Sequence, residues 1–221
     1  MSTARRRRPT SDVMNRVVRQ LKRSYHFTQF LEKNGESPFR ILIGCVLSLR
    51  TKDEVSFPAT ARLFDRAATP ESMLRLRAAT IARLIYPVGF YNRKAEQIRE
   101  ICRELIGRYD GKVPDAIDEL LTLPGVGRKT ANLVVTLGFG KPGICVDTHV
   151  HRISNRLGWV VTPNPDATEQ ALRHTLPRRH WIAFNEILVR HGQKVCKPVS
   201  PICTECIVST DCRRVGVERS R

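Results

Sequence analysis

The stretch that most constrains this chain runs from Leu123 to Val150 and begins with two closely spaced glycines. Gly125 and Gly127 flank one apolar residue directly after Pro124. Glycine adopts backbone angles that other residues avoid, so the chain can reverse its direction sharply here. The segment therefore predicts a tight turn that leads directly into a helix. The apolar residues that follow are typical of a buried helix: Ala131, Leu133, Val134, Val135 and Leu137.

A glycine turn before a helix presents free backbone N–H groups, and these can bind a phosphate oxygen. A Walker phosphate loop is the competing interpretation, but it needs glycine immediately before the lysine and a second glycine five residues before that. Arg128 and Leu123 occupy these two places relative to Lys129, so the Walker interpretation fails. A second polar segment, Asp147-Thr148-His149, opens the next helical pattern.

The charge of the chain favours a polyanionic partner. Lys and Arg number 38 against 21 Asp and Glu, which gives a formal net charge of +17. Such an excess attracts phosphate backbones, but it does not separate DNA from RNA or from an anionic membrane surface. No apolar run approaches the length that spans a bilayer. Residues 1–26 have no apolar signal-peptide core, although an arginine-rich start poor in acids also fits an organelle transit peptide.

Helical periodicity runs through the chain, and no strand-like alternation persists. Phe39–Leu49 is almost entirely apolar, which predicts a central buried helix. Tyr91–Tyr109 predicts a long amphipathic helix that Gly111 ends. We expect an all-α fold of about ten helices after a disordered basic arm at 1–10. The arm contains Arg5–Arg8 and serves either as a solubilising tail or as a tether to DNA.

Four of the seven cysteines gather near the C-terminus, with six, two and five residues between them: Cys196, Cys203, Cys206 and Cys212. In a chain without an export signal, such cysteines indicate a reducing compartment and metal ligation rather than disulfides. Four thiolates in one short segment suit a soft metal centre. Zinc is the competing metal, although zinc ribbons use two close cysteine pairs and only one close pair is present here. The other three cysteines are expected to pack in the core: Cys45, Cys102 and Cys145.

LPGVGRKTAN at Leu123–Asn132, together with VDTH at Val146–His149, resembles the helix-hairpin-helix and following Gly/Pro…Asp element of the endonuclease III family of DNA glycosylases. The similarity extends from about Ser37 to Cys212. The family's catalytic lysine falls on Lys129 and its catalytic aspartate on Asp147, at the family's usual separation. Without the resemblance, the first would be an exposed lysine at a helix start and the second only a helix N-cap.

The resemblance implies an architecture that spacing alone does not show. Residues 31–141 would form a six-helix barrel with the helix-hairpin-helix at about 115–139. Residues 11–30 would join 142–221 in a second helical lobe that holds an iron–sulfur cluster. The active-site cleft would lie between the two lobes. The unequal spacing of the four C-terminal cysteines is the one that this family uses to bind a [4Fe–4S] cluster.

The resemblance also implies a bifunctional DNA glycosylase and AP lyase of base excision repair that acts on oxidised pyrimidines. Lys129, with a pKa lowered by the helix N-terminus and by desolvation in the cleft, would attack C1′ of a flipped nucleotide and form a Schiff base. Asp147 would assist deprotonation and stabilise the positive charge on the sugar. The strand would then break by β-elimination.

Other function classes remain as alternatives. One is a non-catalytic helix-hairpin-helix DNA-binding protein, and another is a mismatch-specific glycosylase. Lys129 favours the bifunctional class, because relatives that lack strand cleavage place tyrosine or serine there. The adenine-removing relatives carry a further C-terminal domain, which is not expected here because the sequence ends nine residues after Cys212.

The expected DNA contacts include two departures from the family pattern. Ser48–Asp53 reads S-L-R-T-K-D where the familiar bacterial form is S-A-Q-A-T-D, so Arg50 replaces a glutamine that fills the gap left by the flipped base. Phe90 replaces a leucine wedge and could insert between bases, or else it is a core residue at a loop end. The full set of expected contacts is Arg50, Phe90, Gly125, Gly127, Arg128 and Lys194, with Lys197, Arg213 and Arg214 as further candidates or plain surface charges.

The expected partner is double-stranded DNA with damaged bases or abasic sites, bound by a monomer. The expected location is the cytoplasm of a prokaryote, in association with the nucleoid. His149 and His151 are expected to be structural neighbours of Asp147 without a metal role, because residues two apart on a helix point to different faces.

Overall fold

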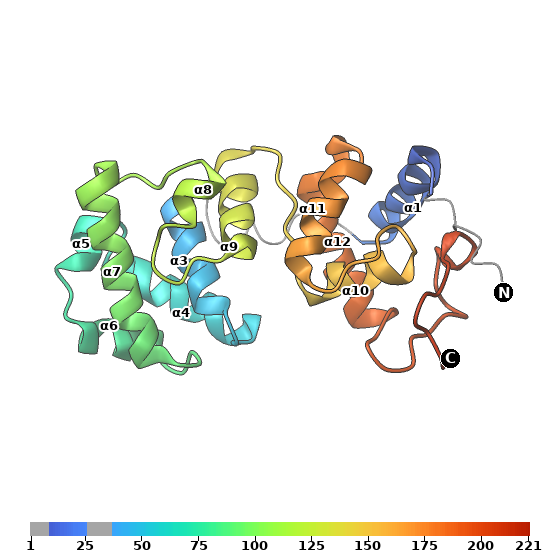
Figure 1. Cartoon of the computed structure of the whole chain (residues 1–221). Helices are drawn as coiled ribbons and strands as arrows, with labels where there is room; N and C mark the ends of the chain where they lie inside the picture. Colours follow the sequence, from blue (N-terminus) through green and yellow to red (C-terminus); the bar gives the residue numbers. More distant parts are fainter. Residues whose placement is uncertain (1–8, 26–36) are drawn as a thin grey trace. The chain divides into compact units, whose positions relative to one another are not determined.

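The computed structural model describes residues 9–25 and 37–221, and within these ranges the chain forms helices and no strand (Figure 1). The expected all-α class is confirmed. The arginine run of the basic arm expected at 1–10 lies outside the described residues. The chain divides into two compact units, which we call the continuous unit, Thr28–Gly143, and the split unit, Met1–Phe27 with Ile144–Arg221.

Helix α3 (Pro38–Ser48) forms the centre of the continuous unit. It packs against α4 (Asp53–Arg66), α7 (Tyr91–Tyr109) and α9 (Arg128–Leu133). Pro38 suits the first helical position, because its fixed φ is already helical and its missing N–H would have had no partner there. Phe39 and all residues from Ile41 to Leu47 are buried, so the predicted central helix is confirmed.

Helix α7 ends where the sequence predicts. Asp110 and Gly111 both take left-handed backbone angles, with φ of 52° and 72°. The Gly111 N–H then donates to the carbonyl oxygen of Leu105 at 2.9 Å, which satisfies one of the carbonyls left open at the helix end. The remaining helices in the described part of this unit are α5 (Pro70–Leu74), α6 (Ala78–Ile85), α8 (Ile117–Leu120) and the π-helical turn η1 (Val134–Gly138).

The split unit is built around α12 (Trp181–Lys194), which packs against α1 (Ser11–Ser24) and α10 (Thr148–Arg156). Trp159 and Phe184 stack in its core, with ring centroids 5.8 Å apart. Residues 178–180 form a 3-10 turn directly before α12. The unit also contains α11 (Pro165–Thr175) and a 3-10 turn η3 (Ser209–Asp211).

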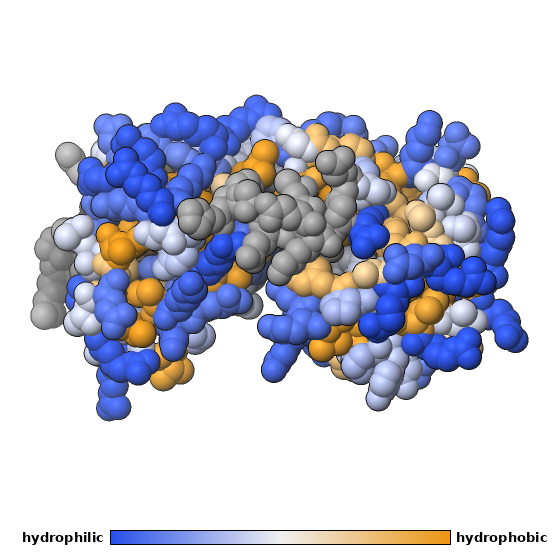
Figure 2. Space-filling model, turned by 180° about the vertical axis from the view of Figure 1, so that it is seen from behind, coloured by the Kyte–Doolittle hydropathy of each residue, from blue (hydrophilic) through white to orange (hydrophobic). Residues whose placement is uncertain are grey.

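Hydrophilic side chains cover much of the face shown in Figure 2, in keeping with the large basic excess of the sequence. Among the described helices, none combines the length and the apolar character needed to cross a bilayer. The cysteines expected in the core are buried: Cys45, Cys102 and Cys145. Burial raises the pKa of Cys45 and of Cys102 to about 12, so both thiols stay protonated and inert.

Candidate active site and metal centre

The glycine turn lies between α8 and α9. Gly125 has φ of +67°, which favours glycine, and a Cβ atom there would collide with the side chain of Gln97. The Gln97 amide donates to the Pro124 carbonyl oxygen at 3.0 Å and so binds the turn to α7. Gly127 is the N-cap of α9, and a Cβ atom there would meet open space. The turn is therefore tightly held on one side and accessible at the start of the helix.

Lys129 is the second residue of α9, and its side chain is exposed. The next three residues, Thr130 to Asn132, are buried and hold the helix against its unit. Asn132 donates to the Arg128 carbonyl oxygen at 3.0 Å, one turn earlier. The ammonium of Lys129 lies near enough to α3 to lower the pKa of Cys45, against the larger effect of burial. The lysine thus projects outward from a helix whose next three residues are buried.

Asp147 is the N-cap of α10. Its Oδ1 accepts a hydrogen bond from the Val150 N–H at 2.8 Å, which fixes the half-buried carboxylate at the positive end of that helix. Asp147 belongs to the split unit and Lys129 to the continuous unit. The encounter of the two side chains in one site stays a prediction.

Arg152, one turn further along α10, was not singled out from the sequence. Its Nη2 donates to the carbonyl oxygens of Cys196 at 2.8 Å and Gly192 at 3.4 Å. Burial lowers the pKa of Arg152, while the charges of Cys196 and Asp147 act in the opposite direction. Arg152 therefore joins the helix that Asp147 caps to the first of the clustered cysteines. Its acceptors are main-chain atoms some 40 positions away, and these leave no signature in the sequence.

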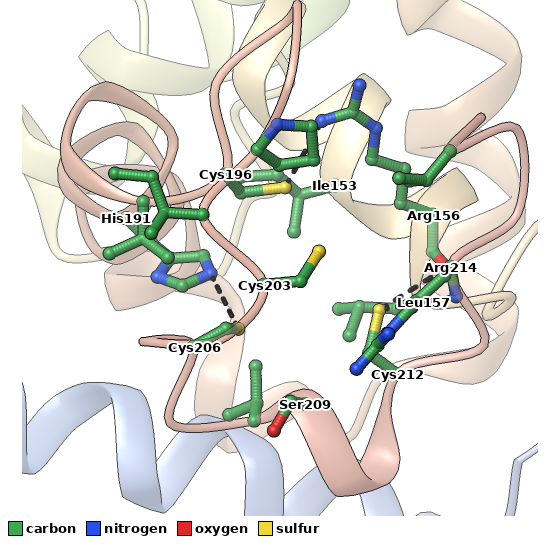
Figure 3. A pocket seen from close by; sticks show the side chains of 15 residues that line it. Ile153, Arg156, Leu157, His191, Cys196, Cys203, Cys206, Ser209, Cys212 and Arg214 are labelled. Carbon is green, nitrogen blue, oxygen red and sulfur yellow. Dashed lines mark hydrogen bonds between the residues drawn. The ribbon is translucent and has the colours of Figure 1, made fainter. Parts of the chain in front are cut away.

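The four C-terminal cysteines line one pocket in the split unit, and their side chains point into a common space (Figure 3). None of them forms a disulfide. Polar groups already approach the sulfurs: Arg156 Nη1 lies 3.4 Å from the Cys196 Sγ, and the Arg214 N–H lies 3.4 Å from the Cys212 Sγ. Such donors stabilise thiolates, which are the form that binds metal.

Four cysteine side chains that line one pocket suit a soft metal centre, and their chemistry fits either a zinc ion or an iron–sulfur cluster. Burial raises the pKa of Cys206 and of Cys212, so metal binding must displace their protons.

The two residues that depart from the family pattern lie together in the continuous unit. Arg50 and Phe90 are not glycine, yet both have left-handed backbone angles, with φ of 52° and 59°. The Arg50 guanidinium carbon lies 5.9 Å from the centroid of the Phe90 ring. Phe90 is 61% exposed, so the alternative that it is a core residue is wrong. Of the other expected contacts, Lys194 is exposed at the end of α12, with its Nζ 6.0 Å from the ring centroid of Tyr25.

Comparison with known proteins gives concordant matches. Residues 43–178 match the family model of the HhH-GPD superfamily of base excision DNA repair proteins. Endonuclease III of Thermotoga maritima is 50% identical over 175 residues, which cover 79% of this chain and 82% of the relative. A structure of a trapped covalent intermediate of endonuclease III with DNA has a TM-score of 0.80 at 34% identity, covering 93% of this chain and 97% of that one. A thermostable thymine-DNA glycosylase has a TM-score of 0.83 at 27% identity, covering 92% and 96%.

These matches extend over most of the chain, and they include both motifs on which the sequence resemblance rests. The resemblance inferred from LPGVGRKTAN and VDTH is thereby confirmed. The chain belongs to the endonuclease III family of the HhH-GPD superfamily, and it is a DNA N-glycosylase and AP lyase of base excision repair.

Proposed function

We propose that this chain removes oxidised pyrimidines from double-stranded DNA as a monomer, with Lys129 as its nucleophile. The observation that carries the proposal is the exposed lysine in the first turn of α9. It stands in a chain that is 34% identical to the endonuclease III trapped in covalent linkage to DNA. A nucleophile must be reachable by a sugar carbon, and a buried lysine would not be.

The neutral amine of Lys129 attacks C1′ of an extruded nucleotide, and the base leaves with the electrons of its glycosidic bond and gains a proton. The sugar ring opens to give an imine between Nζ and C1′. The imine acidifies the C2′ proton, whose loss expels the 3′ phosphate. Water then hydrolyses the imine and returns the free amine. Lys129 is exposed in its own unit, so the sugar of bound DNA can reach its Nζ.

Asp147 would receive the proton of the Lys129 ammonium and stabilise the positive charge that develops on the sugar. Its hydrogen bond to the Val150 N–H holds one carboxylate oxygen in place and leaves the other for this role. Asp147→Asn separates the capping of α10 from the catalytic role, because asparagine is an equally good N-cap but carries no charge. We expect folding and DNA binding to be retained and base removal to fall greatly. Unchanged turnover would remove Asp147 from the mechanism.

The cysteine pocket would hold a [4Fe–4S] cluster, with one thiolate on each iron from Cys196, Cys203, Cys206 and Cys212. Such a cluster would cross-link four points of the irregular segment that follows α12 and thereby order it. The basic residues beside the pocket would then meet the DNA backbone: Lys194, Lys197, Arg213 and Arg214. At the glycine turn, the backbone of Gly125 and Gly127 and the side chain of Arg128 would contact a further phosphate.

Borohydride trapping tests the proposed function. A duplex with one thymine glycol, incubated with the protein and sodium borohydride, should give a stable covalent adduct with the wild-type chain and none with Lys129→Ala. Lys141→Ala is the matched control, because Lys141 is also exposed but is ion-paired with Asp115 at 2.7 Å. A normal adduct with Lys129→Ala would refute the assignment, and no adduct with wild-type protein would refute the proposed substrate class.

A mismatch-specific glycosylase is the second candidate, favoured by the similarity to the thymine-DNA glycosylase. Duplexes with a G·T mismatch, with thymine glycol or with no lesion, offered in parallel, separate the two. Base removal confined to the mismatch, without strand cleavage, would favour this candidate over the removal of oxidised pyrimidines.

A further inference from the structure

Lys94 is a buried lysine to which the proposed mechanism gives no role. It lies in the second half of the first turn of α7, and only 5% of its surface is exposed. Its Nζ donates to the carbonyl oxygens of Leu47 at 2.9 Å and Leu49 at 2.5 Å. A third contact, at 3.3 Å, goes to the hydroxyl of Thr51. All three acceptors belong to the end of α3 and the turn that follows it.

A buried ammonium is costly unless it is well paired, because it loses its hydration. No described carboxylate forms an ion pair with Lys94, and burial lowers its pKa to about 8. The compensation comes from the carbonyls at the C-terminus of α3, which lack helical partners and carry the negative end of the helix dipole. Lys94 thus satisfies the open carbonyls at the end of α3. An apolar residue of similar length would fill the same space without burying a charge, but it would leave these carbonyls without their donor.

The turn that Lys94 holds is the one that presents Arg50. Arg50 lies between two of its acceptors, Leu49 and Thr51, and has a left-handed φ of 52°. A non-glycine residue in this region costs free energy and persists only where its surroundings fix it. Lys94 supplies that fixation from both sides of the strained residue.

The same contacts reach a second loop, residues 86–90, which lies between α6 and α7. The Thr51 hydroxyl oxygen accepts a hydrogen bond from the Gly89 N–H at 3.1 Å, directly before Phe90. The loops meet so closely that a Cβ atom on Gly89 would lie 2.9 Å from the Arg50 carbonyl oxygen. The turn after α3, residues 49–52, therefore determines where the loop before α7 lies. It thereby also fixes the positions of Arg50 and Phe90 relative to each other.

We propose that Lys94 is a positioning residue that joins these two loops into one rigid wedge for base extrusion. This inference rests on the proposed function, together with the expectation from the sequence that Arg50 and Phe90 enter the duplex. A wedge that is already ordered before binding loses less conformational freedom when it inserts, so more of the binding energy is available to unstack the base. Lys94 acts through the loops and contacts neither the base nor the sugar.

The decisive variant is Lys94→Met, which keeps the length of the side chain and removes its donors. Arg99→Met is the matched control on the same helix. Arg99 is half-buried, and it too donates to main-chain carbonyls, those of Leu74 and Leu76 at and just after the end of α5, away from the wedge. Both variants lose a cation that closes a helix end, but only the first releases Arg50 and Phe90.

Two substrates separate extrusion from chemistry. On a thymine glycol duplex we expect Lys94→Met to slow base removal by about 100-fold, the order of effect of small misplacements in a reacting assembly. On a duplex with a preformed abasic site, where no base has to leave the stack, the borohydride adduct should form at close to the wild-type rate. A 2-aminopurine placed beside the lesion should become more fluorescent when the wild-type protein binds, and this rise should be absent with Lys94→Met. Arg99→Met should keep the signal and both rates.

A background that lacks the wedge gives an independent measure. If Lys94 acts through the loops, Lys94→Met should cause no further loss when it is added to Arg50→Ala/Phe90→Ala, because the residues it positions are gone. A full additional 100-fold loss in that background would overturn the proposal. Equal losses of Lys94→Met and Arg99→Met on both substrates would overturn it too, since they indicate a general effect on folding.

If Lys94→Met does not fold, Thr51→Val replaces it as the test. It removes the hydroxyl that both Lys94 and Gly89 contact, at nearly constant volume. The same selective loss on the thymine glycol duplex is expected, and Thr51→Ser, which restores the hydroxyl, should rescue the fluorescence rise. A wild-type rise with Thr51→Val would contradict the proposal. Failure of the wild-type chain to form any adduct on the abasic duplex would instead refute the proposed function.

Discussion

The continuous unit and the split unit both surround an apolar core, but only the split unit ends in a long irregular segment. In the continuous unit, the central helix α3 is buried along nearly its whole length and other helices cover it. In the split unit, residues 195–221, which we call the cysteine tail, contain only the short turn η3. Helix packing therefore explains the first unit fully and the second unit only up to the end of α12.

The cysteine tail is held by individual contacts rather than by the packing of helices. Val208 is buried at 1% exposure, and the Val215 N–H donates to the Arg156 carbonyl oxygen at 3.0 Å. Beyond such contacts, the feature common to the tail and α12 is the pocket that the four cysteines line (Figure 3). The difference indicates that apolar burial orders the helices of both units, whereas the proposed cluster would order the cysteine tail.

The largest expected effect comes from breaking that ligation. Cys206→Ser replaces a soft sulfur ligand by a hydroxyl, so we expect loss of nearly all bound iron and rapid proteolysis within the cysteine tail, with the continuous unit intact. Cys102→Ala is the control, because Cys102 is a buried cysteine of the continuous unit. Iron and sulfide analysis with limited proteolysis measures both. Full iron content in Cys206→Ser would contradict the assigned ligand set, and stoichiometric zinc without iron in wild-type protein would contradict the cluster.

A smaller effect is expected from a cavity in the continuous unit. Leu42 in α3 is fully buried, at 0% exposure. Leu42→Ala should lower the free energy of unfolding by about 2–5 kcal/mol, measured by urea denaturation, with the iron content of the folded protein unchanged. Val161→Ala, at a position that is 94% exposed, should change it by less than about 0.5 kcal/mol. Equal midpoints for the two variants would show that packing around α3 does not hold this unit.

The smallest effect is expected from the ion pair that ties the cysteine tail to α1. Arg16 Nη2 lies 2.6 Å from Asp211 Oδ1, and the arginine side chain is half exposed. Asp211→Asn should cost about 0.2–1 kcal/mol at neutral pH and low salt, and less in high salt.

The pH dependence of this pair has a definite sign. The hydrogen bond from Arg16 lowers the pKa of Asp211 below its ordinary value of 3.8. The stabilisation is therefore present above pH 3.8 and is lost as the pH falls through the lowered value. Wild type and Asp211→Asn should converge in stability in acid. A difference that stays the same from pH 7 down to pH 2 would show that the pair contributes nothing electrostatic.

Local rules predicted most of the helices, because their signals lie within the segments themselves. The apolar run at 39–49 and the stop at Gly111 correspond to α3 and to the end of α7. The glycine turn and the cap at Asp147 are equally local. The placement of Lys129 against Asp147 depends on how two separate units meet, and no rule of periodicity or capping determines that. The family resemblance alone predicts their encounter.

Lys94 shows what sequence reasoning missed and why. It occupies the buried stripe of α7, four residues before Ile98, and a lysine at such a position was the one available signal. Its acceptors are mostly main-chain oxygens 45 and 47 positions away, and a carbonyl has no residue-type signature. The left-handed angles of Arg50 and Phe90 were hidden for a related reason, since neither residue type favours that conformation.

The most direct test of the central claim is to locate the covalent bond to DNA. Wild-type protein trapped with borohydride on an abasic duplex, digested with protease and nuclease and analysed by mass spectrometry, should carry the reduced sugar on the Nζ of Lys129. The account predicts that modification at this lysine and an unmodified Lys94. An adduct on another amine, with the peptide that contains Lys129 recovered unmodified, would contradict it.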